Sequence, residues 1–152
     1  MKEESPENQL AGFIAKFTPE VAAVALAALD KMRARLPGAM ELVYDNYNAL
    51  AIGFAHSERA SDAIFSIALY PRWVSLFFLH GAGLTDPHKL LKGSGKVVRH
   101  IVLKDAATLD DPAVQALIAQ TLGKEHVTFD GTVPGQIIIK SISAKQRSRR
   151  PA

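Results

Sequence analysis

The chain has 152 residues, with 18 lysines and arginines, 15 aspartates and glutamates and no cysteine. The lack of cysteine excludes disulfides, thiolate catalysis and zinc or iron–sulfur sites built on cysteine. Hydrophobic residues make up 48% of the chain, which is typical of a globular domain. No apolar run approaches the roughly 20 residues of a membrane span, and the acidic N-terminus does not resemble a secretory signal. We therefore expect a cytoplasmic protein with no membrane contact.

Positive charge is concentrated at the C-terminal end. Five of the 18 basic residues follow Ile139, whereas the last acidic residue is Asp130, so the rest of the chain carries 13 bases against 15 acids. We predict a single domain over residues 1–142 and a basic, flexible tail over residues 143–152. Such a tail would contact nucleic-acid phosphates weakly and without sequence preference.

Two helices are predicted before residue 37. Apolar residues from Leu10 to Phe17 recur at helical spacing, which predicts a short helix over Glu7–Phe17. Thr18-Pro19 is a capping residue followed by a proline suited to the first helical position, and Pro37-Gly38 ends the second helix.

The middle of the chain has the pattern of strands. One bent strand or two short ones are predicted over Met40–Phe54, a hairpin around Pro71 over Ala63–Leu79, another strand over Val97–Leu103, and an edge strand over Ile137–Ile142.

Two further helices are predicted from the capping pairs Asp86-Pro87 and Asp111-Pro112. The first is a short helix that Gly93 closes, and the second covers Ala113–Leu122. Helices at both ends and strands between them predict an α+β fold, a compact two-layer sandwich in which N- and C-terminal helices pack on an antiparallel sheet of about five strands.

Three motifs together resemble the YdhG-like family of bacterial domains of unknown function. These motifs are the Leu42–Phe54 strand after a proline-ended helix, the Ile64–Leu79 hairpin, and the turn Leu91-Lys92-Gly93-Ser94-Gly95-Lys96 that leads into a strand. The resemblance covers about residues 13–122 and implies a compact α+β sandwich. Some members of the family have been likened to frataxin as cytosolic iron chaperones, so the resemblance makes iron a possible cargo.

The residues themselves predict no metal site and no resident cofactor. The five histidines are not spaced along the chain as metal ligands usually are; they are His56, His80, His88, His100 and His126. No serine lies in a nucleophile-elbow context either.

The turn from Lys92 to Arg99 is the candidate ligand site. Glycines let backbone N–H groups approach an anion, and lysines add positive charge. We predict an anion-binding surface formed by Lys92, Ser94, Lys96 and Arg99. The alternative interpretation is a helix-ending glycine and an ordinary tight turn with a solvated basic surface.

Aromatic residues give two weaker hypotheses. Tyr44, Asn46 and Asn48 combine an aromatic ring with amides and form a possible pocket, although the same residues suit a turn. Trp73, Phe77 and Phe78 could stack on bases, but only Arg72 lies near them in sequence, which favours packing in the core.

These observations favour a small binding or accessory domain without enzymatic activity, whose partner is a small anionic ligand or a protein. Two alternatives stay open: an iron-binding chaperone, and an enzyme whose pocket the sequence does not reveal.

Overall fold

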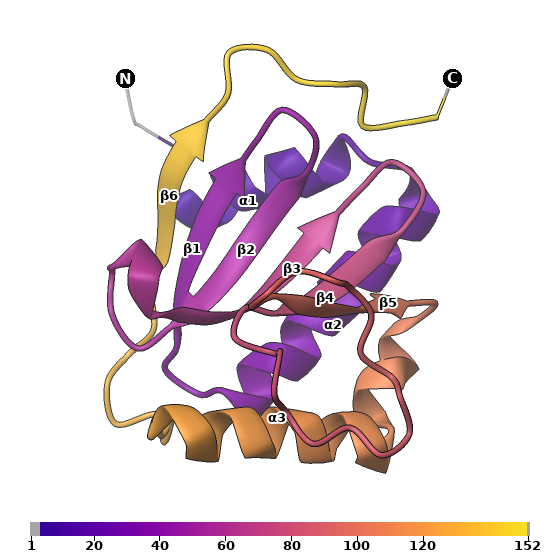
Figure 1. Ribbon diagram of the computed structural model, residues 1–152. Helices are drawn as coiled ribbons and strands as arrows, with labels where there is room; N and C mark the ends of the chain where they lie inside the picture. Colours follow the sequence, from indigo (N-terminus) through magenta and orange to yellow (C-terminus); the bar gives the residue numbers. More distant parts are fainter. Residues whose placement is uncertain (1–3, 152) are drawn as a thin grey trace.

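A six-stranded sheet in the order β5-β4-β3-β2-β1-β6 forms the centre of the molecule (Figure 1). The computed structural model describes residues 4–151. Neighbouring strands are antiparallel, except that β1 and β6 run parallel. The strands are β1 (Met40–Asp45), β2 (Leu50–Ala55), β3 (Ala63–Leu69), β4 (Val74–Phe78), β5 (Arg99–Leu103) and β6 (Ile137–Ile142).

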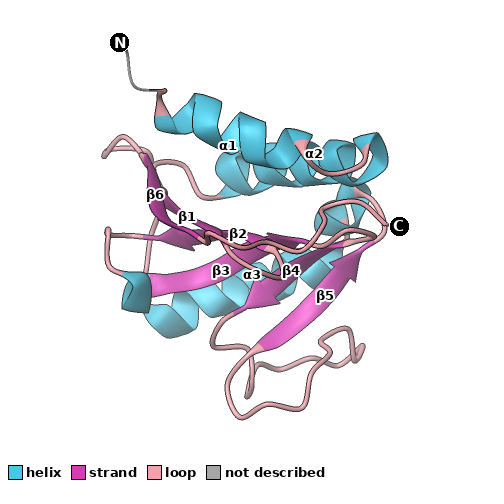
Figure 2. Cartoon of the chain, turned by 90° about the horizontal axis from the view of Figure 1, so that it is seen from above, coloured by secondary structure: helices cyan, strands magenta, loops and turns pink. Residues whose placement is uncertain are grey.

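Helices α1 (Pro6–Ala15) and α2 (Pro19–Arg35) lie together on one face of the sheet (Figure 2). Helix α2 begins at the predicted Thr18-Pro19 pair, whereas α1 begins one residue before the predicted Glu7 and ends at Ala15 and not at Phe17. The hydroxyl oxygens of Ser5 and Thr18 accept hydrogen bonds from backbone N–H groups of the first turn, and a proline fills the first helical position. The caps therefore fix where both helices start.

Helix α3 (Pro112–Glu125) crosses the end of the sheet at which β1 and β6 begin (Figure 1). Asp111 caps its first turn, and His126 ends it in a left-handed conformation with φ 54°. The helix continues through Gly123, so it is longer than the predicted Ala113–Leu122. Two short 3-10 helices, η1 (Ala60–Asp62) and η2 (Ala106–Asp110), precede β3 and α3.

The core lies between the sheet and the α1–α2 layer. Every residue of β3 is buried, and the rings of Phe65 and Phe78 meet edge to face with centroids 5.5 Å apart. Burial of one such side chain contributes about 1.5–3 kcal/mol. Large, fully buried side chains of this core come from α2 and from β2 to β4, among them Leu29, Met32, Leu50, Ile52, Phe54 and Ile67.

The structure confirms the α+β class and the largely antiparallel sheet. The sheet has six strands and not about five, because Met40–Phe54 forms two strands joined at a tight turn, in which the Asn46 N–H donates to the Ala49 carbonyl (3.0 Å). The predicted β3–β4 hairpin is also confirmed, since Tyr70 N–H donates to the Trp73 carbonyl across the turn (2.9 Å).

The predicted helix from Asp86 to Gly93 is wrong, because this segment is a loop. The Asp86 carboxylate accepts from the N–H groups of Leu90 (3.0 Å) and Leu91 (2.8 Å), and Lys89 has a left-handed φ of 53°. A left-handed residue three positions after the cap stops a helix before its second turn.

The C-terminal segment is packed where we expected a flexible tail. Residues 143–151 follow β6 across the β1–β2 turn (Figure 1). Ser143 and Arg147 donate backbone hydrogen bonds to Asp45 and Tyr47, at 2.8 and 2.9 Å. A sequence of basic residues suggests solvation, but here a buried acid on β1 supplies a partner for one of them.

Among residues 4–151, no helix is long and apolar enough to cross a membrane.

Candidate ligand-binding site

Three segments that are distant in sequence meet at one end of the sheet. They are the β1–β2 turn (residues 46–49), the β3–β4 turn (residues 70–73) and the C-terminal segment (residues 143–151), which passes over the first turn towards the second (Figure 1). Because β1 and β3 both run towards this end, the turns that follow them lie side by side.

A buried ion pair holds the C-terminal segment in place. Arg149 is 5% exposed and Asp45 is 1% exposed, and a guanidinium nitrogen of Arg149 donates to Asp45 Oδ1 at 2.8 Å. The same guanidinium group donates to the carbonyl groups of Asn46 (2.6 Å) and Tyr47 (3.3 Å) and lies 5.6 Å from the centroid of the Phe17 ring. Such a group is fixed by charge, hydrogen bonds and packing together.

Arg147 is presented to solvent two residues before this anchor. Its backbone N–H donates to the Tyr47 carbonyl at 2.9 Å, and one guanidinium nitrogen lies 3.5 Å from Asn48 Oδ1. That contact is at the limit of a hydrogen bond. The Arg147 guanidinium group is thus held near the β1–β2 turn while most of its donors stay free to bind a ligand.

The β3–β4 turn contributes an aromatic platform. The rings of Tyr70 and Trp73 are stacked, with centroids 4.6 Å apart and an angle of 16° between their planes. Trp73 is 44% exposed, whereas Tyr70 is partly buried, and this burial raises the pKa of the Tyr70 hydroxyl. The phenol is therefore neutral at physiological pH and adds no negative charge to the site.

A cavity of about 520 Å³ lies between the platform and Arg147. Its lining consists of Asn48, Tyr70, Pro71, Arg72, Trp73 and Arg147. Aromatic faces accept planar rings, arginines bind phosphate or carboxylate groups, and an amide can orient a polar ring edge. The cavity is therefore suited to a planar, negatively charged ligand.

The predicted anion-binding turn lies elsewhere and is open to solvent. Lys92, Ser94 and Lys96 are exposed, and none of them lines the cavity beside Trp73. The Arg99 guanidinium group donates to the carbonyls of Gly95 and Val98 within its own loop. Arg99 thus closes the loop on itself, and anion binding at this turn stays a prediction.

The three residues of the predicted pocket do not line one cavity. Tyr44 packs with Leu42 on the sheet face opposite α1 and α2, and Asn46 is exposed beside the Arg149 anchor. Asn48 alone reaches the cavity beside Trp73. Asn46 and Asn48 lie in the turn after β1, where the regular alternation of strand side chains no longer holds, so they do not continue the face on which Tyr44 lies.

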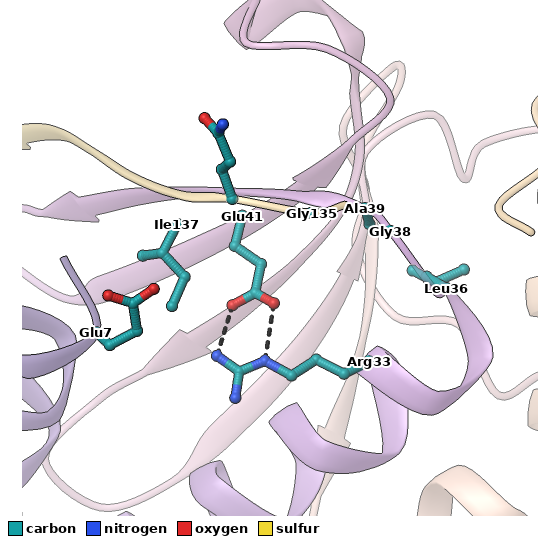
Figure 3. A pocket seen from close by; sticks show the side chains of 9 residues that line it. Glu7, Arg33, Leu36, Gly38, Ala39, Glu41, Gly135 and Ile137 are labelled. Carbon is teal, nitrogen blue, oxygen red and sulfur yellow. Dashed lines mark hydrogen bonds and ion pairs between the residues drawn. The ribbon is translucent and has the colours of Figure 1, made fainter. Parts of the chain in front are cut away.

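A second cavity, of about 260 Å³, contains a closed ion pair (Figure 3). Two nitrogens of Arg33 donate to the two carboxylate oxygens of Glu41, at 2.8 and 2.7 Å, and this hydrogen bonding raises the Arg33 pKa. Glu7 from α1 lines the same cavity. Because the two partners satisfy each other, we interpret the pair as a fastening between the end of α2 and β1.

Residues 4–151 include no group of three or more histidines, aspartates or glutamates placed to hold a metal ion. The paired side chains His80 and Glu125, 2.7 Å apart, are joined by no third ligand in this part of the chain. The hypothesis that the protein carries iron depends on the family resemblance alone.

Comparisons with models of protein families, with curated proteins and with solved structures find no match for this chain. The resemblance to YdhG-like domains stays a prediction from its motifs. The cavity beside Trp73 is the feature of this chain that best indicates a ligand.

The residues that line this cavity are far apart along the chain, so no sequence motif indicates it. Arg72 is the single cation near Trp73 in the sequence, and Arg147 lies in the basic segment that the sequence predicts to be a flexible tail. Trp73 is 44% exposed and does not pack in the core as the sequence suggested. The signal available in the sequence was the Arg72-Trp73 pair after Pro71 in a predicted turn, because arginine and tryptophan are enriched at recognition surfaces.

Proposed function

We propose that this protein is a binding domain for nucleotides and that the cavity beside Trp73 is its site. The observation that supports the proposal most strongly is the shared lining of one cavity by the Tyr70–Trp73 stack and two arginines. A base can stack on the aromatic platform while its phosphate is bound by Arg72 and Arg147. The size of the cavity, about 520 Å³, lies in the usual range for small-molecule sites.

The proposal keeps the anionic ligand that the sequence predicts and moves its site. The Lys92–Arg99 turn offers charge on exposed side chains, whereas the cavity beside Trp73 combines positive charge and aromatic faces in one lining. As part of this proposal, we keep the sequence-based expectation of a small cytoplasmic binding domain without enzymatic activity.

Fluorescence titration tests the proposal directly, because Trp73 is the only tryptophan of the chain. We expect AMP to change the Trp73 emission saturably, and adenosine or inorganic phosphate alone to bind more weakly, since each offers half of the contacts. Arg147→Ala should weaken AMP binding about tenfold, because a hydrogen bond to a charged group contributes about 1.5–3 kcal/mol.

Two variants complete this experiment. Lys145→Ala is the matched control, since it removes an exposed cation from the same segment without touching the cavity, and it should leave affinity unchanged. Lys96→Ala tests the predicted turn. No saturable response to AMP would refute nucleotide binding at Trp73, and a loss of affinity in Lys96→Ala alone would return the site to the Lys92–Arg99 turn.

A further inference from the structure

A second hollow adjoins the site on the other side of Trp73. It has a volume of about 360 Å³, and Arg72 and Trp73 line it as well as the first cavity. Tyr70 lines the first cavity but not the second. Trp73 therefore borders both hollows, whereas its stacking partner Tyr70 borders only the first.

The second hollow has an apolar floor and its own cation. Valines and a leucine from α2, β4 and β5 supply the apolar surface, and Lys104 at the end of β5 supplies the charge. The full lining is Glu20, Val21, Val24, Arg72, Trp73, Val74, Val102, Leu103 and Lys104. An apolar floor with a cation at its rim fits a second base and a second phosphate.

Arg72 connects the two hollows. Arg147 is the cation of the first hollow and Lys104 that of the second, while Arg72 lines both. AMP can occupy the first hollow, between the aromatic platform and Arg147, and leave the second empty. A single strand can occupy both, with its 5′-phosphate at Arg147 and its linking phosphate in the second hollow, which Arg72 and Lys104 both line.

We propose that the natural ligand is single-stranded nucleic acid, with two successive nucleotides in the hollows on either side of Trp73. This inference rests on the proposed nucleotide site and extends it. The binding mode combines stacking on exposed aromatic rings with phosphate contacts, which tolerates different sequences.

Glu20 adds a preference among bases. It is the one acidic residue in the linings of the two hollows. A carboxylate repels phosphate but accepts hydrogen bonds from an exocyclic amino group, which adenine has and thymine lacks. An adenine dinucleotide is therefore the better probe, and the thymine dinucleotide is its matched comparison.

The test measures binding of AMP, of the dinucleotide pApA and of pTpT by Trp73 fluorescence, in the full chain and in two lysine variants. We expect pApA to bind at least tenfold more tightly than AMP, with a steeper dependence on salt because two phosphates are contacted. Lys104→Ala should remove most of this gain and leave AMP affinity unchanged. Lys96→Ala, which removes an exposed lysine from the Gly93–Gly95 turn, should change neither.

Each outcome decides between the two proposals. Equal affinities for AMP and pApA, or an equal loss for both in Lys104→Ala, would overturn the strand inference and leave the nucleotide site standing. Absence of binding by AMP and by both dinucleotides would overturn both proposals. Tighter binding of pTpT than of pApA would support binding of a single strand but refute the role of Glu20. The variant Glu20→Gln tests this role directly, and we expect it to reduce the preference for adenine.

Discussion

The pair formed by Arg149 and Asp45 shows how one residue can determine whether a basic segment is packed or solvated. An isolated buried charge is costly, whereas a buried pair with further hydrogen bonds can be tolerated. Arg149 has its partners on the β1–β2 turn, and Asp45 and Arg149 are both more than nine-tenths buried. We infer that this pair fixes the segment that carries Arg147.

Removal of Arg149 should therefore destabilise the protein. In Arg149→Met the Asp45 carboxylate would remain buried without its cation, which typically costs about 3–5 kcal/mol in the free energy of unfolding. Urea denaturation followed by Trp73 fluorescence or circular dichroism measures the loss. The double variant Asp45→Asn/Arg149→Met should recover part of it, because the uncompensated charge is gone.

Arg150→Met is the matched control for this prediction. Arg150 is exposed and donates one hydrogen bond to the Lys16 carbonyl at 3.1 Å, so its loss should stay within about 0.5 kcal/mol. Equal unfolding free energies for the Arg149 and Arg150 variants would show that the buried pair does not anchor the segment.

At the scale of elements, the loop between β4 and β5 is held by hydrogen bonds and not by a helix. Lys92 and His100 exchange two backbone hydrogen bonds, at 2.8 and 2.9 Å, and the Ala82 N–H donates to the Val97 carbonyl at 2.9 Å. Arg99 adds its donations to Gly95 and Val98. The Gly93–Gly95 turn is thus a structured hairpin that Arg99 closes.

The Arg99 side chain should therefore protect this loop from local opening. We expect Arg99→Ala to speed exchange of the Ala82 amide hydrogen about tenfold, since a lost hydrogen bond to a charged group lowers the local opening free energy by about 1.5 kcal/mol. Hydrogen exchange measured by NMR tests this. Lys96→Ala, in the same loop, should leave the Ala82 rate unchanged, and an unchanged rate in Arg99→Ala would contradict the closing role of Arg99.

At the scale of the whole molecule, the arrangement of charges affects stability in acid. Three carboxyl groups have pKa values below the ordinary range: Asp62 through the Ser57 hydroxyl, Asp110 through Lys31, and Asp130 through Thr132. A carboxyl group whose pKa is lower in the folded state stabilises that state above its unfolded pKa of about 3.9. This contribution is lost as the pH falls through the folded pKa.

We expect the melting temperature to fall as the pH is lowered below about 4. Asp110 joins η2 to α2 through Lys31 at 2.6 Å, so Asp110→Asn should lower the melting temperature at pH 7 and flatten its decline in acid. Thermal unfolding followed by circular dichroism between pH 2 and pH 7 checks both effects, in the pH range set by these pKa values. Parallel curves for Asp110→Asn and the unaltered chain would exclude a contribution from this carboxyl group.

The sequence by itself determined the local features of this protein. Ser5, Thr18 and Asp111 fix the starts of the helices, and Pro71 lies in the turn of a hairpin, because capping and turn formation depend on residues a few positions apart. The α+β class followed from the order of these elements. The loop after Asp86 shows the limit of this reasoning. The Asp86-Pro87 pair is also a helix-capping signal, but the segment that follows it forms a turn and no helix.

Only the tertiary structure decided where the candidate site lies. Asp45 and Arg149, and likewise Trp73 and Arg147, are far apart in the sequence, and the sheet order and the path of the C-terminal segment bring each pair together. Basic residues at a chain end are usually solvated. Burial of Asp45 changes this outcome, because a buried carboxylate requires a cation, and no pattern of neighbouring residues reveals which distant arginine provides it.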